Sequence, residues 1–123
     1  MNKKVLIIDD EQGIRDLLTF LLKPKGFDIT CAEDGLEGIE KFKKESFDIV
    51  LLDIHMPKMN GLEVLKVIKK IKPEQIVIIF SSSSDPQFEL EKKAELSFGV
   101  KTCLYKPFNI DEIITVINDV LKI

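Results

Sequence analysis

The run Ile49-Val50-Leu51-Leu52 is continuously apolar and is followed at once by Asp53. Two further runs share this character, Val5-Leu6-Ile7-Ile8 and Ile76-Val77-Ile78-Ile79-Phe80. A strand that is apolar on both faces, rather than on alternate residues, is typical of a parallel sheet covered by helices on both sides. These runs therefore predict the central strands of an α/β domain.

Two weaker runs complete a set of five predicted strands. The five cover Lys4–Ile8, Asp28–Ala32, Ile49–Leu52, Ile76–Phe80 and Thr102–Tyr105. Between the strands, apolar residues recur at the spacing that places them on one side of a helix. These predicted core faces comprise Ile14, Leu17, Leu18, Leu21 and Leu22; Leu36, Ile39 and Phe42; Leu62, Val64, Leu65, Ile68 and Ile71; and Ile110, Ile113, Ile114, Ile117 and Leu121.

Turn-forming residues mark the ends of the predicted helices. Pro24 and Gly26 end the first helix, whereas Asp34-Gly35, Asn60-Gly61 and Asp85-Pro86 begin the second, third and fourth. Because crossovers between parallel strands are right-handed, this alternation leaves few topologies. We predict a single α/β domain spanning the chain: a doubly wound, five-stranded parallel sheet of flavodoxin-like order 2-1-3-4-5, with helices on both faces.

Composition and charge argue against nucleic-acid-binding, membrane-spanning and exported classes of protein. The 123 residues are 45% hydrophobic and 32% charged, with a formal net charge of −3. A pI of about 5.2 argues against direct binding to nucleic acid, because domains that bind it are usually basic. No apolar run is long enough for a membrane span or a signal peptide. We therefore expect a cytoplasmic protein in which Cys31 and Cys103 are reduced.

Polar side chains follow four of the predicted strands. Asp9-Asp10-Glu11 follows the first, Asp53 the third, Ser81–Ser84 the fourth and Lys106 the fifth. Each aspartate alone is more simply a turn former or helix N-cap, but the carboxyl ends of parallel strands meet at one edge. Clustered carboxylates repel unless a cation compensates, and such oxygen ligands suit Mg²⁺. With a lysine and a hydroxyl, they make a site suited to a phosphoryl group.

These positions belong to longer motifs. The motifs are Ile7-Ile8-Asp9-Asp10-Glu11, the stretch from Leu51 to Gly61, Phe80-Ser81-Ser82 and Tyr105-Lys106-Pro107-Phe108. Through them the chain resembles, over essentially its whole length, the receiver domain of two-component response regulators. Its finer likeness is to single-domain regulators of the phosphorelay or chemotaxis type, and to the receivers of related transcription factors.

The resemblance implies a role for each acidic residue. Asp53 corresponds to the phosphoacceptor, and it is a catalytic residue together with Lys106 and Ser81. Asp10 and Asp53 would bind Mg²⁺ directly, with the backbone carbonyl of His55 as a third protein ligand. Asp9 would contribute to the metal site through water.

The resemblance also implies the remaining catalytic and switch residues. Ser81 stands at the switch hydroxyl position, and the small Ser82 keeps the phosphoryl pocket open. Lys106 would pair with the phosphoryl oxygens and precede a cis peptide bond to Pro107. Cys103 departs from the pattern, because receivers usually carry an aromatic ring at that switch position. The relay from Ser81 to an aromatic ring is therefore in question, whereas phosphorylation is not.

The function that the resemblance implies is a phosphorylation-activated signalling switch rather than a turnover enzyme. A histidine kinase or phosphotransfer protein would donate the phosphoryl group, and the domain would catalyse its own phosphorylation and dephosphorylation. A downstream protein would bind according to a change at the face formed by the fourth strand, fourth helix and fifth strand. No direct nucleic-acid or membrane partner is expected, and the protein would be a monomer or a phosphorylation-linked dimer. Arg15, the only arginine, is by default a surface residue, with contact to a kinase as the alternative.

Other interpretations stay open. The chain could be a receiver cut from a longer DNA-binding regulator, or a receiver-like scaffold that takes no phosphate. An Mg²⁺-dependent phosphohydrolase typically has a second acid two residues after its nucleophile, where this chain has His55. A nucleotide-binding flavodoxin or Rossmann protein is disfavoured, because no glycine-rich loop follows the first strand. The segment 81–99, longer than in many receivers, predicts an altered loop or an extra turn of the fourth helix, or a neutral insertion.

Overall fold

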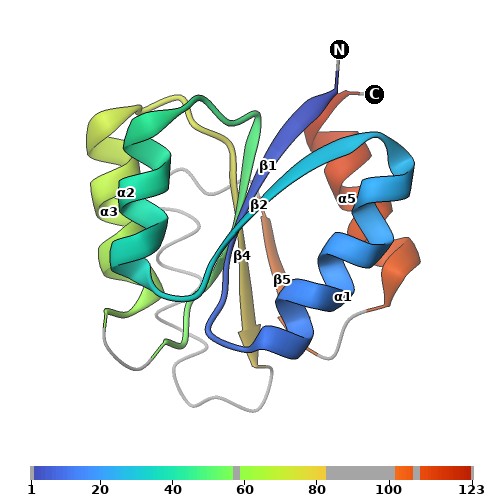
Figure 1. The fold of residues 1–123 in the computed structure, drawn as a ribbon, viewed down its shortest axis with the longest axis horizontal. Coiled ribbons are helices and arrows are strands. Elements are labelled where there is room, and N and C mark those ends of the chain that lie inside the picture. The colour runs from blue at the N-terminus through green and yellow to red at the C-terminus, as the bar shows by residue number, and fades with distance from the viewer. Residues whose placement is uncertain (1, 57–58, 83–101, 107–108, 123) are drawn as a thin grey trace.

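The structure is a computed structural model and describes residues 2–56, 59–82, 102–106 and 109–122 (Figure 1). For residues 81–82, 102–103, 105–106 and 110, it describes the backbone only. The predicted fourth helix and the lengthened segment before the fifth strand lie outside the described residues.

The described strands form one parallel sheet of order β2-β1-β3-β4-β5, so the predicted fold and strand order are confirmed. The strands are β1 (Lys3–Ile8), β2 (Phe27–Ala32), β3 (Ile49–Asp53), β4 (Val77–Ser82) and β5 (Thr102–Lys106). Their bounds agree with the predicted runs to within two residues. The differences matter at the carboxyl ends, where Asp53, Ser81 and Lys106 belong to the strands rather than to the loops that follow them.

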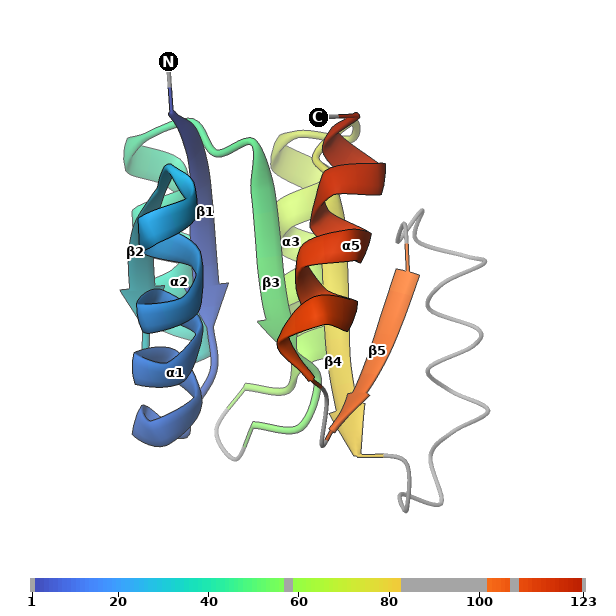
Figure 2. The ribbon, with the colours of Figure 1, turned by 90° about the vertical axis from the view of Figure 1, so that its right-hand side faces the viewer.

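Helices cover both faces of the sheet. Those described are α1 (Gln12–Leu22), the short 3₁₀ turn η1 (Lys23–Lys25), α2 (Gly35–Lys44), α3 (Gly61–Ile71) and α5 (Ile110–Leu121). Helices α1 and α5 lie on one face, and α2 and α3 on the other (Figures 1 and 2). None of the helices in the described part of the chain has the length and apolar character needed to cross a bilayer.

The central strands bury both of their faces, as their apolar runs predict. In β1, Leu6 and Ile8 join the core beneath α2 and α3, whereas Val5 and Ile7 join the core beneath α1 and α5. All four side chains are fully buried. Because successive side chains of a strand point to opposite faces, each central strand contributes to both cores.

Three residues of the predicted core faces are exposed instead. Leu17, Leu36 and Ile71 keep 44%, 63% and 46% of their surface accessible. In α1 the fully buried residues are Leu18 and Leu22, four residues apart. Since neighbouring helix positions differ by about 100° in direction, Leu17 lies at the edge of this line of contact. The apolar face predicted for α1 was therefore wider than the face that the structure buries.

The predicted helix starts at Asp34 and Asn60 are confirmed as N-caps. The Asp34 side chain accepts a hydrogen bond from the Glu37 N–H (2.8 Å), and that of Asn60 accepts one from the Glu63 N–H (3.0 Å). These bonds satisfy backbone donors that the first turn of a helix leaves without a partner. At the end of η1, Gly26 adopts φ 93°, a conformation that glycine reaches without steric cost.

Gly61 brings the start of α3 against the end of β3. Its N–H donates to the Ile54 carbonyl (2.9 Å), and a Cβ at this position would lie 2.3 Å from the Ile54 Cα and 2.6 Å from the Asp53 carbonyl oxygen. Both neighbours are backbone atoms, so a side chain could be accommodated only by moving the strand end that carries Asp53.

We predict that Gly61→Ala lowers the free energy of unfolding by about 3 kcal/mol, because overpacking against backbone cannot relax locally. Gly13→Ala is the matched control, since a Cβ at Gly13 would meet nothing within 4 Å. That change should leave stability unchanged or raise it by about 0.5 kcal/mol. Urea unfolding measures both, and equal stability of the two variants would contradict the close approach at Gly61.

Candidate functional site

The ends of four strands meet at the carboxyl edge of the sheet. In the β1–β3 register Ile8 lies opposite Leu52, so that Asp9 follows beside Asp53. In the next pair Asp53 lies opposite Phe80, and in the last pair Ser82 lies opposite Lys106. The parallel register therefore brings together positions that are far apart along the chain.

Four carboxylates gather at this edge. Asp9, Asp10, Glu11 and Asp53 each offer an oxygen, and these oxygens all lie within 4.8 Å of one another. The Asp9 and Asp53 side chains are buried, whereas Asp10 and Glu11 are exposed at the rim. The predicted grouping of Asp9, Asp10 and Asp53 is thus present, and Glu11 is an additional member that the predicted ligand set omitted.

Asp9 is fixed through both its backbone and its side chain. Its N–H donates to the Ala32 carbonyl at the end of β2 (3.1 Å), and its Oδ1 accepts from the Glu11 N–H (2.9 Å). The second bond closes a tight turn directly before α1. The carboxylate is therefore held in one direction although the residue lies outside the regular strand.

Asp53 is oriented by the loop that follows it. Its Oδ1 accepts a hydrogen bond from the His55 N–H at 3.0 Å. The next residue, Ile54, donates its N–H to the Phe80 carbonyl (3.0 Å) and accepts the bond from Gly61 described above. The loop is thus tied to β4 on one side and to the start of α3 on the other, which limits the directions that the Asp53 carboxylate can take.

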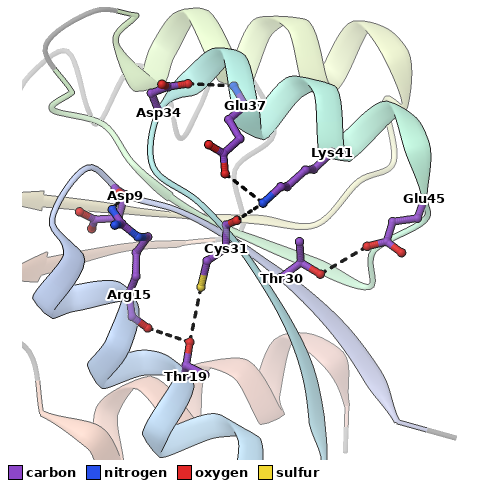
Figure 3. Close-up of polar contacts among 9 residues, drawn as sticks. All are labelled: Asp9, Arg15, Thr19, Thr30, Cys31, Asp34, Glu37, Lys41 and Glu45. Atoms are coloured by element: carbon purple, nitrogen blue, oxygen red, sulfur yellow. Dashed lines mark hydrogen bonds and ion pairs between the residues drawn. The ribbon is translucent and has the colours of Figure 1, made fainter.

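Arg15 does not have the simple surface role expected as its default. The side chain is half-buried on α1, and its Nη1 donates to the backbone carbonyl of Asp9 at 2.8 Å. Figure 3 shows the side chain running from α1 toward Asp9. Among the ion pairs of the described residues, none joins Arg15 to one of the four carboxylates. The contact holds the loop rather than neutralising a particular acid.

The cluster fits a small, hard divalent cation. All of its donors are carboxylate oxygens, which Mg²⁺ and Ca²⁺ prefer to nitrogen or sulfur. With bonds of about 2.1 Å, opposite oxygens around one Mg²⁺ lie about 4.2 Å apart. The 4.8 Å within which the four oxygens fall is close to that distance. Two of the acids are exposed, so a cation can enter from solvent and keep some of its water.

The other predicted site residues are placed by their backbone only. Ser81 lies opposite Tyr105, and Cys103 lies opposite Ile79, on the adjoining strands β4 and β5. Lys106 is the last residue of β5. Their side chains lie outside the described part, so their roles as hydroxyl, lysine and switch residues stay predictions. The role of the His55 carbonyl as a metal ligand also stays a prediction.

The chain is similar in sequence to a known protein. The chain is 38% identical over 119 residues to a transcriptional regulatory protein CpxR homolog of Haemophilus influenzae, covering 97% of this chain and 50% of that protein. The chain thus spans about half the length of this relative.

Two solved structures resemble the whole chain. A CheY-like response regulator receiver domain protein of Methanospirillum hungatei superposes with a TM-score of 0.91 at 28% identity, covering 99% of this chain and 95% of the other. The chemotaxis protein CheY4 of Vibrio cholerae superposes with a TM-score of 0.88 at 27% identity, covering 98% and 99%.

The family of the chain follows from the sequence motifs, the sheet order and the acidic cluster taken together with one further match. The sequence model of the response regulator receiver domain matches residues 5–118. That match contains all four clustered acids and every described strand except the first two residues of β1. The chain belongs to the family of response regulator receiver domains.

Proposed function

We propose that this receiver domain is a phosphorylation-activated signalling switch that accepts a phosphoryl group on Asp53. The observation that carries the proposal is the position of Asp53: buried, last in a central strand, and within a cluster of carboxylates that fits one divalent cation. Membership of the receiver family supports it.

The chemistry assigned to Asp53 is a displacement at phosphorus. A carboxylate oxygen of Asp53 forms a bond to the phosphorus of the donor, and the bond from phosphorus to the donor's imidazole nitrogen breaks. The hydrogen bond that Asp53 Oδ1 accepts from the His55 N–H restrains the orientation of this carboxylate. Bound Mg²⁺ would supply the charge neutralisation that lets an anionic oxygen approach an anionic phosphoryl group.

Asp10 is proposed as a direct Mg²⁺ ligand together with Asp53 and the His55 carbonyl, and Asp9 as a contributor through water. The exposure of Asp10 at the rim supports its role, because a cation and its retained waters can reach this carboxylate from solvent. Oxygen-only coordination with retained waters is what Mg²⁺ favours.

Lys106 and Ser81 are proposed to contact the transferred phosphoryl group. The β4–β5 register supports this assignment, because it brings their backbones to the same edge as Asp53. Phosphorylation adds negative charge and strong hydrogen-bond acceptors that a lysine and a hydroxyl can bind. Contacts made in one chemical state alone can shift the equilibrium between two conformations of the face around β4 and β5. Because Cys103 replaces the usual aromatic residue, this shift would not depend on a ring at that position.

The proposed donor is a histidine kinase or phosphotransfer protein, and the proposed reader is a downstream protein in the cytoplasm. A second arrangement has support from the CpxR homolog, of which this chain matches about half. In that arrangement the receiver controls a further domain of a longer regulator. The chemistry at Asp53 is the same in both cases.

We predict that, with Mg²⁺ and a small phosphodonor, the intact mass rises by one phosphoryl group and that Asp53→Asn abolishes the rise, because the amide is not a nucleophile toward phosphorus. Intact-protein mass spectrometry measures the change. The matched control is Asp34→Asn, which keeps a good N-cap at α2 and lies outside the acidic cluster.

Three outcomes would change the assignment. Phosphorylation that persists in Asp53→Asn would place the acceptor elsewhere. A wild-type protein that takes no phosphoryl group from any donor would favour the scaffold interpretation, and steady turnover of small phosphate esters would favour a phosphohydrolase.

We further predict that Asp10→Asn weakens Mg²⁺ binding by more than about tenfold, since removing a metal ligand costs more than removing a residue that only supports one. Isothermal titration calorimetry measures the affinity. Glu33→Gln removes the same charge from an exposed carboxylate after β2, outside the cluster, and should change the affinity by less than about twofold. Equal affinity for the Asp10 variant and the wild type would refute the metal assignment.

A further inference from the structure

The turn between β1 and α1 carries three of the four clustered acids, so its shape decides whether they can share a cation. Among the contacts that hold Asp9, its N–H donates to the Ala32 carbonyl, its Oδ1 accepts from the Glu11 N–H, and its carbonyl accepts from Arg15. The last of these contacts comes from a side chain outside the turn. Arg15 therefore fixes the peptide group that joins Asp9 to Asp10.

Arg15 is itself anchored on a helix that is tied to the sheet. The Thr19 hydroxyl donates to the Arg15 carbonyl (2.8 Å) and lies 3.4 Å from the Cys31 sulfur on β2 (Figure 3). In the next layer, Lys41 of α2 donates to the Cys31 carbonyl. The base of the arginine is thus held by elements that do not belong to the acidic turn, which gives the guanidinium a fixed point from which to hold Asp9.

We propose that Arg15 is a positioning residue of the phosphorylation site, holding the Asp9–Asp10 peptide so that the acids of this turn and Asp53 can bind one Mg²⁺. The inference rests on the proposed function for its metal. The guanidinium donates to a carbonyl and pairs with none of the four acids among the described ion pairs. It therefore stabilises the turn without occupying the oxygens that the cation needs.

Because Arg15 is positively charged, the direction in which its removal changes the Mg²⁺ affinity tests the inference. A positive charge near a cation site disfavours the cation by simple electrostatics, so removing that charge should tighten Mg²⁺ binding. If the contact with Asp9 shapes the turn, removing it should weaken Mg²⁺ binding instead. The two roles thus predict opposite changes for the same variant.

The experiment compares Arg15→Met with Arg15→Lys in the full chain by calorimetric titration with Mg²⁺. Methionine keeps an apolar stem but has no donor, and the affinity should fall by about tenfold or more, the usual effect of losing a residue that orients a metal ligand. Lysine keeps the charge and a donor, and should restore part of that loss. Thermal unfolding confirms that both variants are folded.

Lys25→Met is the control for net charge. Lys25 is exposed in η1, ten positions beyond Arg15. Along a helix that separation corresponds to about 15 Å, more than the Debye length of about 10 Å at moderate salt. The Mg²⁺ affinity of this variant should stay within about twofold of the wild-type value.

A metal-free measurement separates this inference from the proposed function. The Glu11 N–H is bonded to Asp9 Oδ1, so its hydrogen exchange reports the shape of the turn without Mg²⁺. It should exchange faster in Arg15→Met than in the wild type. Unchanged exchange together with unchanged or tighter Mg²⁺ binding would overturn the role of Arg15. A wild-type protein that binds no Mg²⁺ would instead refute the metal site, and the exchange rate alone would then decide whether Arg15 holds the turn.

Discussion

The placement of Asp9 beside Asp53 is the constraint on which the rest of the site depends. Two carboxylates whose oxygens lie within 4.8 Å repel each other by about 3 kcal/mol at the effective dielectric typical of such sites. Both side chains are buried, so solvent does little to relieve the repulsion. Each carboxylate accepts a backbone N–H, from Glu11 in one case and His55 in the other, and these hydrogen bonds offset part of the repulsion. This arrangement holds negative charge ready for a cation.

The same edge carries acids in two positions, because Asp53 is the last residue of a strand whereas Asp10 and Glu11 follow one. The strand that ends in Asp53 is apolar and buried on both faces, so it cannot shift without exposing core residues on one side or the other. Immediately beyond it, the backbone is tied to Phe80 and Gly61. Asp10 and Glu11 instead lie exposed at the rim. The site thus combines a buried, hydrogen-bonded acid with acids that solvent can reach.

The polar contacts around Cys31 connect the edge strand β2 with both layers of helices. Thr19 reaches Cys31 from α1, and Lys41 reaches its carbonyl from α2 while pairing with Glu37 (2.9 Å). Glu37 in turn donates its N–H to the cap residue Asp34 (Figure 3). Because β2 is an edge strand, these contacts supplement a ladder that pairs on one side only. They stabilise the part of the fold that carries the arginine and the acidic turn.

The amino-acid sequence by itself determined the strands, the sheet order and the acids Asp9, Asp10 and Asp53, because hydrophobic periodicity and strand-end residues are local properties that right-handed crossovers convert into a topology. Only the tertiary structure decided that Leu17, Leu36 and Ile71 stay exposed, since the width of a buried helix face depends on how closely the helix approaches the sheet. It also decided that Glu11 joins the cluster and that Arg15 reaches the Asp9 carbonyl. The contact of Arg15 depends on the position of α1 beside the sheet, and the packing of this helix on the core decides that position together with the turn.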